Sequence, residues 1–177
     1  MERIEVHVDE RLASAGDVLP LAGHIDLEGY ELGNHEFSLP AGLDYDLMLT
    51  NAGDGILASG IVRAQVEGEC DRCLEPASFD LSAEVNEYFL FEEPEELADD
   101  EDEVDFSLVE DDRIDVSEAI MAALLMDTPY VVLCKEDCKG LCPRCGANLN
   151  EGDCGCAERD EERRMEESPF AALKNLM

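Results

Sequence analysis

Basic residues are scarce in this 177-residue chain. It has 12 lysines and arginines against 45 aspartates and glutamates, which gives a net charge of −33. Broad binding to a phosphate backbone depends on lysine and arginine side chains that displace counterions. The composition therefore argues against general nucleic-acid binding by the chain as a whole and favours basic protein partners.

Long apolar runs and targeting signals are lacking as well. The longest apolar run, residues 119–126, is far shorter than the ~20 residues that span a bilayer. The first ten residues have neither the basic start nor the apolar centre of a secretory signal. We therefore expect a cytoplasmic protein without a membrane partner, in a compartment that keeps cysteines reduced.

Catalytic motifs are absent too. His7, His24 and His35 are scattered over the N-terminal third, without the serine or cysteine pattern of a catalytic triad. No glycine-rich phosphate loop occurs, and carboxylates are so abundant that no pair can be assigned as acid and base. We expect the protein not to be an enzyme.

The chain does have eight cysteines, arranged as four close pairs: Cys70 and Cys73, Cys134 and Cys138, Cys142 and Cys145, and Cys154 and Cys156. A tetrahedral zinc ion is held by four thiolates at about 2.3 Å, and a C-x2-C turn supplies two of them from one tight loop. The four pairs therefore predict two structural zinc ions, each held by four cysteines.

Spacing favours one grouping of these pairs over the others. The local unit CPRCGANLNEGDCGC would hold one zinc through Cys142, Cys145, Cys154 and Cys156. Cys134 and Cys138 would then join Cys70 and Cys73 in a second site that links the C-terminal segment to the middle of the chain. The sequence leaves other groupings open.

Other uses of the cysteines compete with zinc. Disulfides suit an even cysteine count but need an oxidising compartment. Cys138, Cys142 and Cys145 have the C-x3-C-x2-C spacing of radical enzymes that bind an iron–sulfur cluster. Those enzymes hold this loop in a large barrel, whereas only 32 residues follow Cys145. An iron–sulfur or thiol redox protein remains the alternative function.

Four basic residues lie among the cysteines: Arg72, Lys135, Lys139 and Arg144. The segment from Cys134 onward has a net charge of only −3, against −30 for the first 133 residues. The four cations either offset the negative charge of the zinc–thiolate centres or provide the place where RNA or a partner is contacted. We favour the first interpretation.

Alternating apolar residues predict a β-rich fold. Ile4 to Val8, Leu43 to Leu49, Ile56 to Glu69 and Phe79 to Phe91 read as strands, with a hairpin turn at residues 51–55. The turn after the third of these strands contains Cys70 and Cys73. We expect an α+β, β-rich fold: an antiparallel meander or small barrel with a central helix and a C-terminal cysteine-rich zinc module.

Three segments complete the expected organisation. Residues 1–133 form an acidic body that contains a helix at 115–127, which Asp115 caps. An insert at 92–112 has 13 acidic residues and no basic ones, typical of a solvated linker, or else of a nucleic-acid mimic anchored by Phe106, Leu108 and Val109. Residues 134–156 form the zinc module and 157–177 a helical tail whose apolar face consists of Phe170, Leu173 and Leu176.

Two cysteine segments resemble the YceD-like family, the large ribosomal RNA subunit accumulation proteins. They are Gly68–Pro76 and Cys138–Asn150, the latter followed by Cys154 and Cys156. Residues 114–129 and the closing Ser-Pro-Phe-Ala-Ala-Leu resemble the family's intervening helix and terminal motif. The resemblance covers roughly residues 40–177, while residues 1–40 match loosely.

The resemblance implies a non-enzymatic ribosome-biogenesis factor that promotes the synthesis, processing or accumulation of large-subunit ribosomal RNA. Such a factor would bind a ribosomal protein, a pre-ribosomal particle or RNA, or a processing factor. Family genes tend to lie beside the gene for a small protein of the large subunit, which suggests a partner. A transcription-related zinc protein would need a basic recognition face that the sequence lacks.

Overall fold

The computed structural model describes residues 3–93 and 107–167, and these divide into two units. The first unit comprises residues up to Gly68 together with Ser78–Tyr130, and the second comprises Glu69–Ala77 and the chain from Val131 onward. The Cys70–Cys73 turn, which the sequence analysis placed in the body, therefore belongs to the same unit as the other six cysteines.

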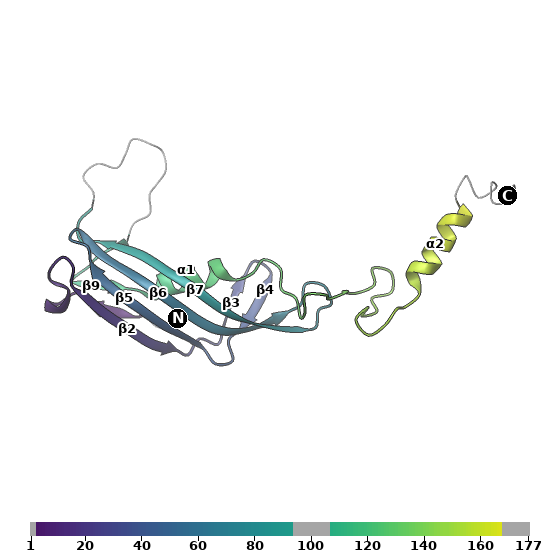
Figure 1. Cartoon of the computed structure of the whole chain (residues 1–177), viewed down its shortest axis with the longest axis horizontal. Coiled ribbons are helices and arrows are strands. Elements are labelled where there is room, and N and C mark those ends of the chain that lie inside the picture. Colours follow the sequence, from purple (N-terminus) through teal and green to yellow (C-terminus); the bar gives the residue numbers. More distant parts are fainter. Residues whose placement is uncertain (1–2, 94–106, 168–177) are drawn as a thin grey trace, which may run out of the picture. The chain divides into compact units, whose positions relative to one another are not determined.

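The first unit is built on antiparallel strands, as predicted (Figure 1). The strands are β1 (Glu5–His7), β2 (Val18–Ile25), β3 (Gly29–Leu32), β4 (His35–Ser38), β5 (Leu43–Asn51), β6 (Gly55–Glu69), β7 (Pro76–Leu90), β8 (Ser107–Leu108) and β9 (Arg113–Asp115). The first unit also contains a short 3-10 turn (Glu10–Leu12) and the helix α1 (Ser117–Asp127), whereas the helix α2 (Cys156–Glu167) lies in the second unit.

Seven of the strands form one sheet in the order β2-β5-β6-β4-β3, with β7 paired to β6 and β8 paired to β7. The β5–β6 and β6–β7 hairpins confirm the predicted meander, including the turn that closes with Asn51 opposite Ile56. The other two strands, β1 and β9, pair with each other. In the described part of the chain, no helix is both long and apolar enough to cross a membrane.

The core of the sheet follows the alternation seen in the sequence. Leu47 and Leu49 of β5 are buried and lie opposite Gly60 and Ala58 of β6. Small residues on β6 leave room for the leucines. At Gly60 the strands approach so closely that an added Cβ would lie 2.2 Å from the carbonyl oxygen of Asp46.

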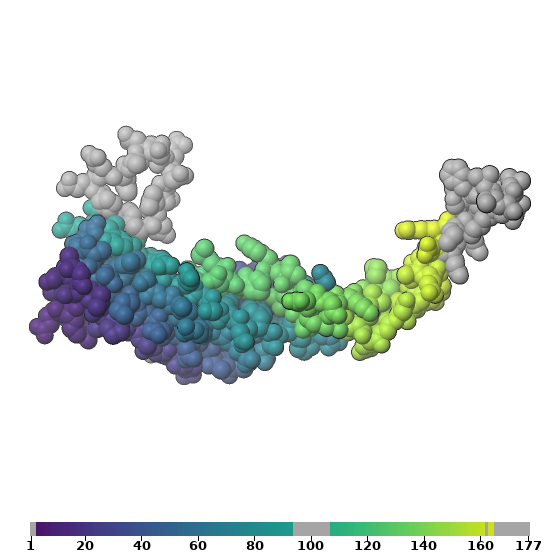
Figure 2. All heavy atoms as spheres, viewed as in Figure 1, coloured from purple at the N-terminus to yellow at the C-terminus, as the bar shows by residue number. Residues whose placement is uncertain are grey.

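Helix α1 packs on the strands through Ile120, Ala123 and Leu124, all of them buried. Figure 2 shows its atoms directly against those of the strands. The end of the helix is tied down by Thr128, whose hydroxyl contacts the carbonyl oxygen of Leu124 and the hydroxyl of Tyr30, each at 2.7 Å. These contacts confirm the predicted central helix.

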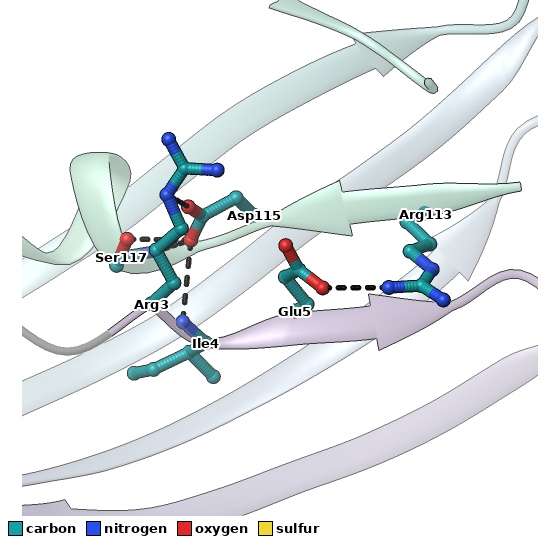
Figure 3. A network of polar contacts seen from close by, with 6 residues as sticks. All are labelled: Arg3, Ile4, Glu5, Arg113, Asp115 and Ser117. Carbon is teal, nitrogen blue, oxygen red and sulfur yellow. Dashed lines mark hydrogen bonds and ion pairs between the residues drawn. The ribbon is translucent and has the colours of Figure 1, made fainter. Parts of the chain in front are cut away.

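The start of α1 differs slightly from the prediction. Asp115 was expected at the N-cap position, but Val116 occupies it, and the carboxylate of Asp115 accepts the backbone N–H of Ser117 at 2.9 Å. Asp115 also accepts the N–H of Ile4, and Arg113 pairs with Glu5 at 2.9 Å (Figure 3). Asp115 therefore joins the segment before β1 to the first residue of the helix.

The end of the acidic insert is part of the fold, which corrects the expectation of a linker throughout residues 92–112. Ser107 and Leu108 of β8 pair in parallel with Phe89 and Leu90 of β7. The turn from Glu110 to Arg113 then leads into β9. Residues 94–106, including Phe106, lie outside the described residues, as do Phe170, Leu173 and Leu176 of the tail.

Candidate metal centres

The structure brings the eight cysteine sulfur atoms together in two groups of four. The first site consists of Cys70, Cys73, Cys134 and Cys138, and the second site of Cys142, Cys145, Cys154 and Cys156. Within each site, all sulfur atoms lie within 4.8 Å of one another. This is the grouping that the cysteine spacing favoured, and both sites lie in the second unit.

The distances between sulfur atoms fit a single metal ion in the first site. The sulfur atoms of Cys70 and Cys138 are 3.7 Å apart, and those of Cys73 and Cys134 are 3.6 Å apart. Four thiolates about 2.3 Å from one tetrahedral ion lie about 3.8 Å apart. A disulfide would need about 2.05 Å, and all eight cysteines are free. A four-iron cluster would spread the sulfur atoms over four separate metal atoms.

The first site is built on the turn that joins β6 to β7. The N–H of Cys70 donates to the carbonyl oxygen of Glu75, and the N–H of Leu74 donates to that of Cys70, each at 2.9 Å. Burial alone would raise the pKa of Cys70. The backbone N–H groups of Cys134, Arg72 and Cys73 bond its sulfur and lower the pKa to about 6. The turn therefore favours a thiolate, the form that binds metal.

The second site repeats this turn. The N–H of Gly146 donates to the carbonyl oxygen of Cys142 at 2.9 Å, just as Leu74 donates to Cys70. The backbone N–H groups of Cys145 and Arg144 lower the pKa of Cys142 to about 6. Both turns thus present their first cysteine as a metal ligand by the same backbone arrangement.

Hydrogen bonds between neighbouring thiols oppose ionisation of all four thiols in a site. The neighbouring thiol of Cys145, followed by burial, raises the pKa of Cys156 to about 12. A cation at the centre would remove this opposition because it attracts every thiolate. The donor set and its spacing therefore fit zinc, which prefers sulfur ligands in a tetrahedron.

The four basic residues among the cysteines have different surroundings. Arg72 donates to the carbonyl oxygen of Cys138 at 2.9 Å, and Arg144 forms an ion pair with Asp160. Among the described residues, the side chains of Lys135 and Lys139 form no ion pair. Arg72 and Arg144 thus hold the second unit together, while the two lysines present their charge to solvent.

Two further side chains contact the cysteine sulfur atoms and were missed in the sequence. Arg159 on α2 donates to the sulfur of Cys156 at 3.3 Å and to the carbonyl oxygen of Cys154 at 3.0 Å. The side-chain amide of Asn150 donates to the sulfur of Cys138 at 3.3 Å and lowers its pKa. Helical spacing, three residues after Cys156, could have indicated Arg159. Asn150 carries no comparable signal.

Leu74 provides a test of the turn geometry. It has a φ of +61°, a conformation that favours glycine, and Gly146 fills the corresponding position of the second site with a φ of +72°. Leu74 is also 61% exposed, so little apolar contact would be lost on its removal. The left-handed conformation costs an L-residue about 1–2 kcal/mol, and glycine loses about 0.5–1 kcal/mol more entropy on folding.

We therefore expect Leu74→Gly to raise the free energy of unfolding of the zinc-loaded protein by up to about 1 kcal/mol. Denaturant unfolding followed by circular dichroism would measure the change. Leu74→Ala serves as the control because it keeps a Cβ at the left-handed position and should bring no gain. A clear destabilisation by glycine alone would contradict the geometry.

Comparison with known proteins places these sites in a family context. The family model described as large ribosomal RNA subunit accumulation protein YceD matches residues 58–177, which include all eight cysteines. An uncharacterized protein of Mycobacterium tuberculosis is 37% identical over 110 residues, covering 60% of this chain and 51% of that protein. The chain thus spans about half the length of the mycobacterial relatives that it matches. No solved structure matches.

Two plant relatives carry a descriptive name. The proteins of Arabidopsis thaliana and Zea mays named large ribosomal RNA subunit accumulation protein YCED homolog 1, chloroplastic, are 31% and 30% identical over 65 and 129 residues. These matches cover 37% and 57% of this chain, and 20% and 44% of the plant proteins. With more than half of its length matched by the family model, the chain belongs to the YceD family of large ribosomal RNA subunit accumulation proteins.

Proposed function

We propose that this protein is a non-enzymatic, cytoplasmic factor of ribosome biogenesis that promotes the synthesis, processing or accumulation of large-subunit ribosomal RNA. Family membership carries the proposal, together with the names of the two plant relatives. The factor acts by binding a ribosomal protein, a pre-ribosomal particle or RNA, or a processing factor.

Zinc in both sites would serve structure rather than catalysis. Each site offers four thiolates, which fill the tetrahedral coordination of one zinc ion and leave no position for water or substrate. When bound, zinc would close the chain around residues 70–73 and 134–156. Cys70, Cys73, Cys134 and Cys138 would hold one ion, and Cys142, Cys145, Cys154 and Cys156 the other.

The first unit suits a basic protein partner. It contains four basic and 32 acidic residues, a net charge of −28. Three of its arginines, Arg3, Arg11 and Arg113, form ion pairs with carboxylates of the same unit. The fourth, Arg63, lies opposite Asp44 in the sheet. A basic ribosomal protein is therefore the partner that we assign to this unit. Opposite charges would hold the two proteins together, so salt would weaken their binding.

The second unit is the candidate for RNA contact. It has eight basic and 13 acidic residues, a net charge of −5. Because Arg72 and Arg144 bond within the unit, Lys135 and Lys139 are the cations that we assign to an RNA phosphate.

Deleting the gene and measuring the ratio of large- to small-subunit ribosomal RNA tests the function. We expect a lower ratio that the wild-type gene restores, and a Lys135→Ala, Lys139→Ala variant to restore it incompletely. The purified chain should also capture large-subunit proteins at low salt and fewer of them at moderate salt. An unchanged ratio in the deletion strain, or no ribosomal component captured at either salt, would refute the proposal.

A further inference from the structure

We propose that Asn150, which lies in the loop of the second site, is a positioning residue for the first site and thereby couples the two metal sites. This inference rests on the zinc sites of the proposed function but not on any ribosomal partner. In the sequence, Asn150 lies between two ligands of the second site, but its side chain contacts Cys138 of the first site.

The side-chain amide of Asn150 is used in full by the first site and its own loop. Its Nδ2 group donates to the sulfur of Cys138 at 3.3 Å and to Oδ1 of Asn148 at 2.9 Å. Its Oδ1 accepts the backbone N–H of Lys139, the residue after Cys138, at 2.9 Å. The amide thus fixes the backbone next to a first-site ligand and donates to the sulfur itself.

Backbone bonds extend this contact into a seam between the two sites. The N–H of Leu149 donates to the carbonyl oxygen of Gly140 at 2.9 Å, and Leu141 pairs with Asn148. On the other side, the N–H of Leu141 donates to the carbonyl oxygen of Arg72 at 3.0 Å, within the first site's turn. Residues 139–141 therefore lie between the first site and the loop that contains Asn150.

The close fit at Gly140 explains how the backbone on one side of this seam fixes the backbone on the other side. Gly140 has a φ of +74°, and a Cβ added there would lie 2.9 Å from the carbonyl oxygen of Arg72. The loop that contains Asn150 starts from the second site's turn, where the backbone N–H of Cys142 donates to the carbonyl oxygen of Ala147 at 2.8 Å. A metal ion held by Cys142, Cys145, Cys154 and Cys156 would fix this turn and thereby hold Asn150 against Cys138.

Coupling of this kind acts equally in both directions. If filling the second site strengthens zinc binding at the first, filling the first strengthens binding at the second by the same factor. The coupling passes through Asn150 only while Cys138 is part of a competent first site. With the first site disabled, Asn150 has no metal-binding role, although it lies between two ligands of the second site.

The test measures zinc affinity by competition with a chelating dye, on the full chain. Outer contacts to metal ligands typically change metal affinity by 10–100-fold. We expect Asn150→Ala to lower the affinity for one of the two zinc ions by about this factor. In a Cys73→Ser background, which retains only the second site, we expect Asn150→Ala to leave the affinity of the remaining zinc unchanged. Glu151→Ala, an exposed neighbour in the same loop, is the matched control and should change neither affinity.

A second variant separates the hydrogen bond from the shape of the side chain. Asn150→Asp keeps the oxygen that accepts from Lys139 but places an acceptor, not a donor, beside the sulfur of Cys138. We expect it to weaken the first site at least as much as alanine does. The proposal is overturned if alanine weakens the zinc that remains in Cys73→Ser, if it weakens neither ion, or if aspartate binds both ions as the wild type does. A protein without any zinc would instead refute the metal assignment itself.

Discussion

Cys73→Ser is expected to reduce the metal content from two zinc ions per chain to one. Serine keeps the size of the side chain but removes the thiolate, and the first site is left with three sulfur ligands. Structural zinc binds to zinc-finger peptides with an apparent free energy of about 10–16 kcal/mol. The second site therefore keeps its ion even if loss of the first weakens it. Elemental analysis of protein purified without oxygen, with a visible spectrum alongside, gives the count and the metal.

The matched substitution in the second site is Cys145→Ser, which should remove the ion of the second site and leave the ion of the first. Loss of both ions from Cys73→Ser would mean that neither site holds zinc independently, and loss of neither would mean that Cys73 is not a ligand. If the wild type contains iron and absorbs visible light, the cysteines hold an iron centre and not zinc. The alternative function, a redox protein, would then be favoured.

Leu47→Ala is expected to lower the free energy of unfolding by about 2–5 kcal/mol. Leu47 is 1% exposed and lies opposite Gly60, which has no side chain to move into the cavity. The strands already touch at Gly60, so they cannot close further around the missing atoms. Urea unfolding followed by circular dichroism measures the loss.

Met48→Ala is the control for this prediction. Met48 is the next residue on β5, points to the other face and is 41% exposed. Exposed substitutions of this kind usually change stability by no more than about 0.5 kcal/mol. Both variants should retain two zinc ions because the cysteines lie in the other unit. Equal losses of unfolding free energy from the two variants would mean that the face of β5 with Leu47 is not the core face of the sheet.

The sequence predicted the long elements of the first unit well. Strands β5, β6 and β7 each bury alternate residues over nine residues or more, and a periodic pattern of that length is a strong local signal. Residues 9–35 have no long periodic pattern, because β2 contains proline and glycine and β3 and β4 have only four residues each. β3 and β4 form a local hairpin, but the pairing of β2 with β5 and of β4 with β6 depends on partners elsewhere in the chain. The same holds for β8, whose two residues pair in parallel with β7.

By itself, the sequence determined the chemistry of the metal centres. Eight cysteines in four close pairs are enough ligands for two tetrahedral ions, since ligand type and number are properties of the side chains. The charge of −33 likewise decided the class of partner that we assign to the acidic unit.

Only the tertiary structure decided which sulfur atoms meet and what surrounds them. The chain brings Cys70 and Cys73 to Cys134 and Cys138, about sixty residues away, because the β6–β7 turn bonds to residues 132 and 141. The same folding brings Arg72 to the carbonyl oxygen of Cys138 and Arg144 to Asp160, and it aims Asn150 at Cys138. Such roles depend on contacts between distant segments, and local spacing carries no information about them.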